Sequence, residues 1–170
     1  NIFIGASPKG SLKVDLTIGE LPTGNVITVL PESALHLPRL ISHDYRLYPV
    51  VDQIADKVCA TMATYTGRTS SREKDLVDLV ALATTQEVDG NRLRIALATE
   101  AARRKLELGA HFRVPPGWGR GYEPLSRGIP YCAGHRTLEL ALDLVTRFID
   151  PALTRAADGK LWSPTILSWN

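Results

Sequence analysis

Two kinds of spacing between apolar residues divide the chain. In the segment Ser11–Ile18, apolar and polar residues alternate, as is typical of a half-buried β-strand, and Asp15 falls on the polar face. Turn residues follow, and further strands are predicted at 26–30 and, more briefly, at 47–51. The beginning of the chain therefore predicts a fragment of a β-sheet with its connections.

From Asp52 onward the spacing becomes helical. Apolar residues recur at every fourth position along one face of the first predicted helix, at Ile54, Val58 and Met62. Ser70 is followed three residues later by Glu73, a capping-box pattern that predicts the start of a second helix. A third helix is expected over 89–108, because a glycine follows it directly.

The last predicted helix covers 137–149 and ends before Pro151, since proline disrupts a helix interior. Between the third and fourth helices, the segment 114–122 contains too many glycines and prolines for regular structure. It also carries Trp118 and Tyr122, two large aromatic side chains. This combination predicts a loop that is pinned onto the rest of the fold.

Length and composition favour a folded chain with a real core. The 170 residues are 44% apolar and 22% charged, and no apolar run approaches the roughly 20 residues of a membrane span. Strands that precede helices predict a mixed α+β fold, with a sheet core in 1–51 and a helical part in 52–170. Cys59 and Cys132 show no metal-ligand spacing, and a disulfide between them stays open. Because no export signal is visible, we expect a cytoplasmic protein without a membrane partner.

The net charge of +2 is unevenly distributed along the chain. The segment 90–136 contains nine basic and three acidic residues, so it carries +6 and the remainder carries −4. Such a segment suits the phosphates of a nucleic acid, although a solvated helix surface is the commoner cause of this asymmetry. Its densest part is the run Arg103, Arg104 and Lys105, which we expect to contribute to a nucleic-acid surface.

Polar residues on the first strand and the first two helices form the candidate site. Lys57 lies near the beginning of its helix, where a mobile ammonium can reach a phosphate, although a solvated lysine paired with a neighbouring aspartate is a simpler interpretation. Asp75 and Asp78 are three residues apart, and an acid in a first helical turn also suits the helix dipole. Asp75 would accept a proton, orient Lys57 or hold a metal-bound triphosphate. With Asp15 it offers the oxygen ligands that Mg²⁺ prefers.

Three segments together resemble a known family. They read Leu12-Lys-Val-Asp-Leu16, Asp52-Gln-Ile-Ala-Asp-Lys-Val-Cys-Ala60 and Arg72-Glu-Lys-Asp-Leu-Val-Asp-Leu79. In content and order they are similar to successive motifs of the AbiEii/AbiGii family of nucleotidyltransferase-like toxins, which includes the MenT-like group. The later loop, the last helix and the tryptophan-containing end also resemble family members, so the resemblance covers nearly the whole chain.

The resemblance implies a fold, an activity and partners. The fold would be a DNA polymerase β-like nucleotidyltransferase sheet, here a fragment, followed by helices. The activity would be that of a toxin in a toxin-antitoxin system, with a cognate antitoxin as partner. It would use a nucleoside triphosphate (NTP) and Mg²⁺ to add nucleotides to the 3′ end of tRNA, which blocks translation.

The resemblance also assigns roles to individual residues. Lys57 matches the triphosphate-binding lysine, and Arg72 and Lys74 belong to the following motif as further substrate-binding residues. Asp75 matches the essential acid of that motif. Asp15 matches a strand carboxylate with a catalytic and metal-binding role.

One departure from the family pattern leaves two functions open. Family members carry a Gly-Ser turn and an Asp-x-Asp motif before the strand of Asp15, whereas only Gly5-Ala-Ser-Pro-Lys-Gly-Ser11 stands in the corresponding place here. Either the motif lies in sequence before Asn1, which the absence of an initial Met favours, or this member lacks it. In the second case the chain would be a degenerate domain that binds nucleotide, RNA or antitoxin without catalysis.

Overall fold

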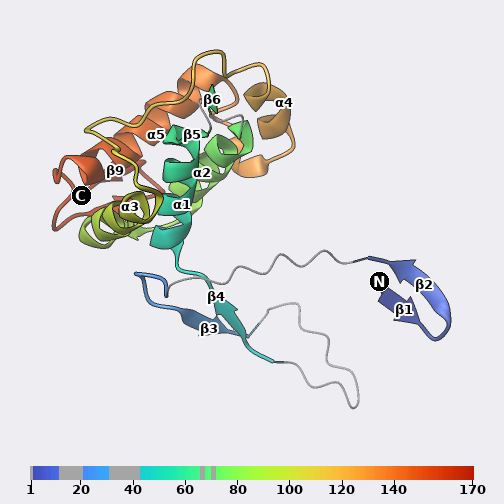
Figure 1. Ribbon diagram of the computed structural model, residues 1–170. Coiled ribbons are helices and arrows are strands. Elements are labelled where there is room, and N and C mark those ends of the chain that lie inside the picture. The colour runs from blue at the N-terminus through green and yellow to red at the C-terminus, as the bar shows by residue number, and fades with distance from the viewer. Residues whose placement is uncertain (1, 12–20, 31–42, 66–67, 70–71) are drawn as a thin grey trace.

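The computed structural model describes residues 2–11, 21–30, 43–65, 68–69 and 72–170. It shows a helical part and several small antiparallel sheets (Figure 1). The mixed α+β class predicted from the order of strands and helices is confirmed. Asp15, and with it nearly all of the strand predicted at 11–18, lies outside the described residues.

Two antiparallel hairpins form the described beginning of the chain. Their strands are β1 (Ile2–Ile4) with β2 (Ser7–Gly10), and β3 (Ile27–Val29) with β4 (Tyr45–Leu47). β3 confirms the strand predicted at 26–30. β4 lies earlier than the predicted 47–51, because the first helix already begins at Val50, directly after Pro49. The β1–β2 hairpin was not predicted.

Five α-helices follow in the described residues. They are α1 (Val50–Met62), α2 (Glu73–Thr85), α3 (Gly90–Arg104), α4 (Tyr122–Arg127) and α5 (Leu138–Leu153). The four long helices confirm the periodicity, whereas α4 falls at the end of the segment predicted as a loop. α3 ends before the predicted Leu108, because Lys105 adopts a left-handed conformation with φ of 54°.

Short elements complete the fold. A hairpin joins β5 (Thr64–Tyr65) to β6 (Arg68–Thr69), a 3₁₀ turn spans Pro130–Cys132, and one sheet contains β7 (Val88–Asp89), β8 (Leu161–Ser163) and β9 (Ser168–Trp169). In the core, α1 packs against α2 and α3, and α5 packs against the same two helices. Their facing apolar side chains, such as Ile54, Leu76 and Phe148, are fully buried. This helical core fixes the relative positions of α1 and α2.

The capping box predicted from Ser70 and Glu73 is wrong in its consequence for Glu73. α2 begins at Glu73 itself, so this residue occupies the first helical position rather than the third. Its carboxylate instead accepts a hydrogen bond from the backbone N–H of Gly119 at 3.1 Å. Gly121 approaches so closely that a Cβ there would lie 2.8 Å from the same carboxylate. Glu73 therefore docks the 114–122 segment onto the start of α2.

The aromatic residues of that segment confirm that it is pinned onto the fold. Trp118 packs against the hydrophobic core, and Tyr122 is fully buried. The hydroxyl of Tyr122 donates to the carbonyl of His135 at 2.6 Å. The segment is thus held in its middle and at its last residue, although Tyr122 belongs to α4 rather than to a loop.

Pro151 does not end the last helix as predicted, because α5 continues to Leu153. A proline has no N–H, so the carbonyl of Arg147, four residues earlier, lacks its helical donor. The indole N–H of Trp169 lies 3.2 Å from the carbonyl oxygens of both Arg147 and Phe148. A side chain of the C-terminal strand β9 therefore takes over the hydrogen bond that the proline removes.

Candidate functional site

Lys57 on α1 joins two aspartates on α2. Its ammonium nitrogen lies 3.1 Å from Asp75 Oδ1 and 3.1 Å from Asp78 Oδ2. Arg72, just before α2, places its Nε 2.9 Å from Asp75 Oδ2. The structure thus brings together Lys57, Asp75 and Arg72 of the predicted site and adds Asp78. We call these four residues the Lys57 cluster.

Asp75 is the buried centre of the Lys57 cluster. Its side chain is only 2% exposed, whereas that of Asp78 is 34% exposed. Asp75 Oδ2 has the guanidinium of Arg72 within ion-pair distance, but the described residues supply no donor in hydrogen-bond geometry. Burying a carboxylate is costly unless it is fully paired. A buried carboxylate in such a charged cluster favours a functional role for Asp75.

The environment of Lys57 keeps its ammonium charged. Burial lowers the pKa of Lys57, but hydrogen bonds to Asp75 and Asp78 outweigh that effect, so the pKa lies above its usual value. The two cations and two carboxylates of the cluster balance each other. An incoming phosphate must therefore displace one carboxylate from Lys57 or arrive with a compensating cation. Asp78 is the partner that can leave, because it is the more exposed of the two.

Lys74, a further predicted site residue, stands apart from the cluster. Lys74 is exposed on α2, and within the described part of the chain no hydrogen bond or ion pair links it to the four residues. Asp15 lies outside the described residues. The described residues contain no group of three metal-ligating side chains, and Asp75 and Asp78 are both engaged with Lys57. The Mg²⁺ site and the role of Asp15 therefore stay predictions.

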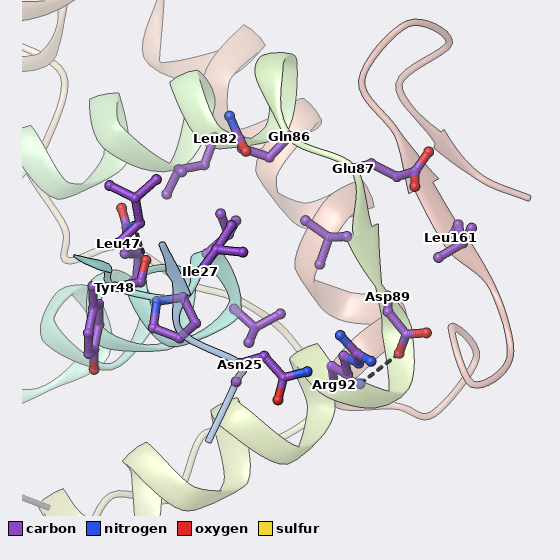
Figure 2. A pocket seen from close by; sticks show the side chains of 16 residues that line it. Asn25, Ile27, Leu47, Tyr48, Leu82, Gln86, Glu87, Asp89, Arg92 and Leu161 are labelled. Atoms are coloured by element: carbon purple, nitrogen blue, oxygen red, sulfur yellow. Dashed lines mark hydrogen bonds between the residues drawn. The ribbon is translucent and has the colours of Figure 1, made fainter. Parts of the chain in front are cut away.

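A cavity of about 670 Å³ lies between the β3–β4 hairpin and the helical part (Figure 2). Ile27 and Leu47 of the hairpin form one wall, and Leu82 at the end of α2, with β7 and the start of α3, forms the other. The four residues of the Lys57 cluster do not line it. The cavity and the charged cluster are thus separate features, and the predicted site residues Lys57, Asp75 and Arg72 belong to the cluster.

The hairpin wall is tied to α1 by Asp52. This buried carboxylate accepts hydrogen bonds from the N–H of Thr23 at 2.9 Å, its hydroxyl at 2.6 Å, and the N–H of Gly24 at 2.8 Å. A Cβ at Gly24 would lie 2.7 Å from Pro49 Cβ, so only glycine fits there without displacement. The sequence did not predict this role of Asp52, because its three hydrogen bonds come from a segment nearly thirty residues away and no local pattern indicates them.

The basic segment divides into paired and unpaired residues. Arg94 pairs with Asp158, and Arg103 and Arg104 both pair with Glu100. Within the described ranges, the other six basic residues are exposed and have no acidic partner: Arg92, Lys105, Arg113, Arg120, Arg127 and Arg136. The expectation that Arg103, Arg104 and Lys105 contribute to a nucleic-acid surface stays a prediction, and of these three only Lys105 has no acidic partner among the described residues. Four of these six residues lie on α4 or on the segments that flank it, namely Arg113, Arg120, Arg127 and Arg136.

The comparison with protein families identifies the chain. The profile described as "Nucleotidyl transferase AbiEii toxin, Type IV TA system" matches residues 1–160. The chain belongs to this family of nucleotidyltransferase toxins of type IV toxin-antitoxin systems, which implies a nucleotide substrate and an antitoxin partner. Searches among curated proteins and among solved structures gave no match.

Two further observations bear on the sequence predictions. Cys59 and Cys132 are both buried as free thiols, so the open question of a disulfide between them is answered. Burial raises the pKa of the Cys59 thiol to about 12, which leaves it protonated and unreactive at neutral pH. Among the described residues, no helix is both long and apolar enough to cross a membrane.

Proposed function

We propose that this toxin transfers nucleotides from an NTP to the 3′ end of tRNA and thereby blocks translation. The observation that carries the proposal is the position of Lys57, held between Asp75 and the more exposed Asp78. A cationic donor that is oriented in advance stabilises the charge that develops on a phosphate during transfer.

The roles of the cluster residues follow from their contacts. Lys57 would bind the triphosphate, and Asp75 would orient Lys57 rather than accept a proton, because it is already held by two cations. Arg72 is half-exposed, so a substrate can reach its guanidinium. Lys74 would act only at the outer rim, since it is exposed on α2.

Mg²⁺ is proposed from the family resemblance rather than from the described residues. It would accompany the triphosphate, as is usual for enzymes that act on NTPs, and Asp15 would supply the protein carboxylate. A cytoplasmic location follows from the same proposal, because tRNA is the substrate.

The proposal is tested by incubating the full-length protein with Mg²⁺, total tRNA and each labelled NTP in turn. We expect label to enter tRNA from at least one NTP. Transfer RNA oxidised at its terminal ribose is the matched control, because it lacks the 3′ hydroxyl that attacks. Equal labelling of intact and oxidised tRNA would contradict 3′ addition, and binding of NTP without any labelling would favour the non-catalytic alternative.

A further inference from the structure

The cavity and the Lys57 cluster are adjacent on both helices. On α1, Gln53 lines the cavity and lies four residues before Lys57; on α2, Leu82 lines it and lies four residues after Asp78. Residues four apart share one face of an α-helix and are about 6 Å apart along its axis. The cavity therefore begins one helical turn from the ion pair between Lys57 and Asp78.

The lining of the cavity combines apolar walls with a few polar side chains. The apolar residues include Ile27, Leu47, Val51, Leu82 and Val88. Polar side chains stand among them: amides at Asn25, Gln53 and Gln86, the guanidinium of Arg92, and carboxylates at Glu87 and Asp89. Its volume of about 670 Å³ falls within the range of small-molecule sites, which have this kind of lining.

A nucleobase matches this lining. It is a flat ring with apolar faces, and its edges carry hydrogen-bond donors and acceptors that amide and guanidinium groups pair with in proteins. A nucleotide also has its charged phosphates at one end and its base at the other. The order along α1 and α2, from charged cluster to mixed cavity, is the order of groups in such a ligand.

We propose that the cavity is the nucleoside subsite of the triphosphate site, with the phosphates at Lys57 and the base between the hairpin and α2. This assignment rests on the proposed function, because it takes an NTP as the ligand. The hairpin wall is positioned for this role by the three hydrogen bonds to Asp52, which fix it to the helix that carries Lys57.

The test narrows the cavity without disturbing the core. Ile27 lines the cavity and is 57% exposed, so Ile27→Trp adds bulk there while burying no polar group. Thr28 is the next residue on β3 and points to the opposite face of the hairpin, so Thr28→Trp is the matched control. Arg92→Ala is a second variant, because the helix-capping hydrogen bond to Asp89 uses only the backbone N–H of Arg92.

Binding is measured for inorganic tripolyphosphate and for each NTP with Mg²⁺ and without tRNA, alongside thermal melts. We expect wild type to bind its preferred NTP more tightly than tripolyphosphate. Ile27→Trp should lose about tenfold or more of NTP affinity, a size typical of steric misfit in a pocket. The affinity of Ile27→Trp for tripolyphosphate should not change, and Thr28→Trp should behave as wild type. Arg92→Ala should reduce the differences in affinity among the NTPs.

The outcomes separate this inference from the proposed function. If wild type binds tripolyphosphate and NTP equally, or if folded Ile27→Trp binds NTP as wild type does, the cavity is not the nucleoside subsite although the triphosphate site stands. If wild type binds neither probe, the proposed triphosphate site fails and the subsite fails with it.

Discussion

Asp56 and Lys57 are neighbours on α1 but belong to different charged networks. Lys57 joins α1 to α2 through Asp75 and Asp78. Asp56 joins α1 to α3 through Arg104, whose guanidinium also donates to Glu100 at 2.6 Å. Each network links two core helices of the same fold, and in both a basic side chain is held by two acids.

The two networks differ in how deeply their carboxylates are buried and in how many hydrogen-bond donors these carboxylates have. Arg104 donates to two partly exposed carboxylates, so neither of these acids is buried without a donor. In the Lys57 cluster, Asp75 is almost fully buried, and among the described residues its Oδ2 has the ion pair with Arg72 at 2.9 Å but no donor in hydrogen-bond geometry. The comparison shows that ion-pair geometry alone does not mark a site. What distinguishes the Lys57 cluster, and supports the proposed site, is a deeply buried carboxylate beside a more exposed one, whereas the Arg104 network links two helices through partly exposed acids.

The largest expected effect is that of Lys57→Ala on activity. We expect toxicity in a growth assay to be abolished, because removing one preorganised charge from a transferring phosphate costs about a hundredfold or more in rate. Stability should fall by only about 1–2 kcal/mol in thermal or urea melts, since Asp75 keeps Arg72 as a partner. Full toxicity of the folded variant would remove Lys57 from the site.

The two aspartates of the cluster should differ in the same assay. Asp75→Asn should reduce transfer by about a hundredfold, because the variant no longer has the buried charge that orients Lys57. Asp78→Asn should change it by less than about tenfold, since Asp78 is the more exposed of the two partners and can leave Lys57 when phosphate binds. Transfer rates of Asp75→Asn and Asp78→Asn, measured at saturating NTP, give both reductions. Equal reductions would mean that Asp78 does not act as the releasable partner.

The basic segment should show a smaller, salt-dependent effect. Neutralising the unpaired Arg120, Arg127 and Arg136 together should weaken tRNA binding and lower the salt slope by about one for each phosphate that these arginines neutralise in wild type. Neutralising the paired Arg103 and Arg104 should change the slope less, because those charges are already balanced within the protein. Titrations of tRNA at several salt concentrations test this. A larger change of the salt slope on neutralising Arg103 and Arg104 would place the paired arginines, rather than the unpaired ones, on the tRNA surface.

The smallest effect on activity is expected for Arg104→Ala. It should lower the free energy of unfolding by about 1–2 kcal/mol, since it removes a clamp between α1 and α3, while NTP affinity and transfer stay near wild type. Chemical unfolding and transfer assays on one preparation measure both quantities. A reduction of transfer as large as that of Lys57→Ala, without unfolding, would show that both networks serve the reaction.

Local sequence patterns predicted local structure, and they failed where contacts with distant residues determine where an element ends or which partner a side chain has. The spacing of Ile54 and Val58 was enough to place α1, because helix periodicity is a property of the nearby sequence. The end of α5 could not be predicted, because the donor that replaces the missing N–H of Pro151 is the indole of Trp169, eighteen residues later. Glu73 was misassigned for the same reason, because its partner is the distant Gly119. The strands β8 and β9 are too short to show a pattern.

The candidate site was predictable in part. The motifs containing Lys57 and Asp75 led to a pair that the structure brings into contact. The pairing of Asp78 with Lys57 depends on how α1 packs against α2, which no single motif specifies. The cavity depends on a further long-range event, the attachment of the hairpin to Asp52.

The most direct test of the account compares Lys57→Ala with Arg104→Ala in the transfer assay, at equal concentrations of folded protein. Labelled NTP, Mg²⁺ and total tRNA are supplied, and label in tRNA is counted over time. The account predicts near wild-type incorporation by Arg104→Ala and none above background by Lys57→Ala. Incorporation by Lys57→Ala at the rate of Arg104→Ala would contradict the claim that the Lys57 cluster is the site of nucleotidyl transfer.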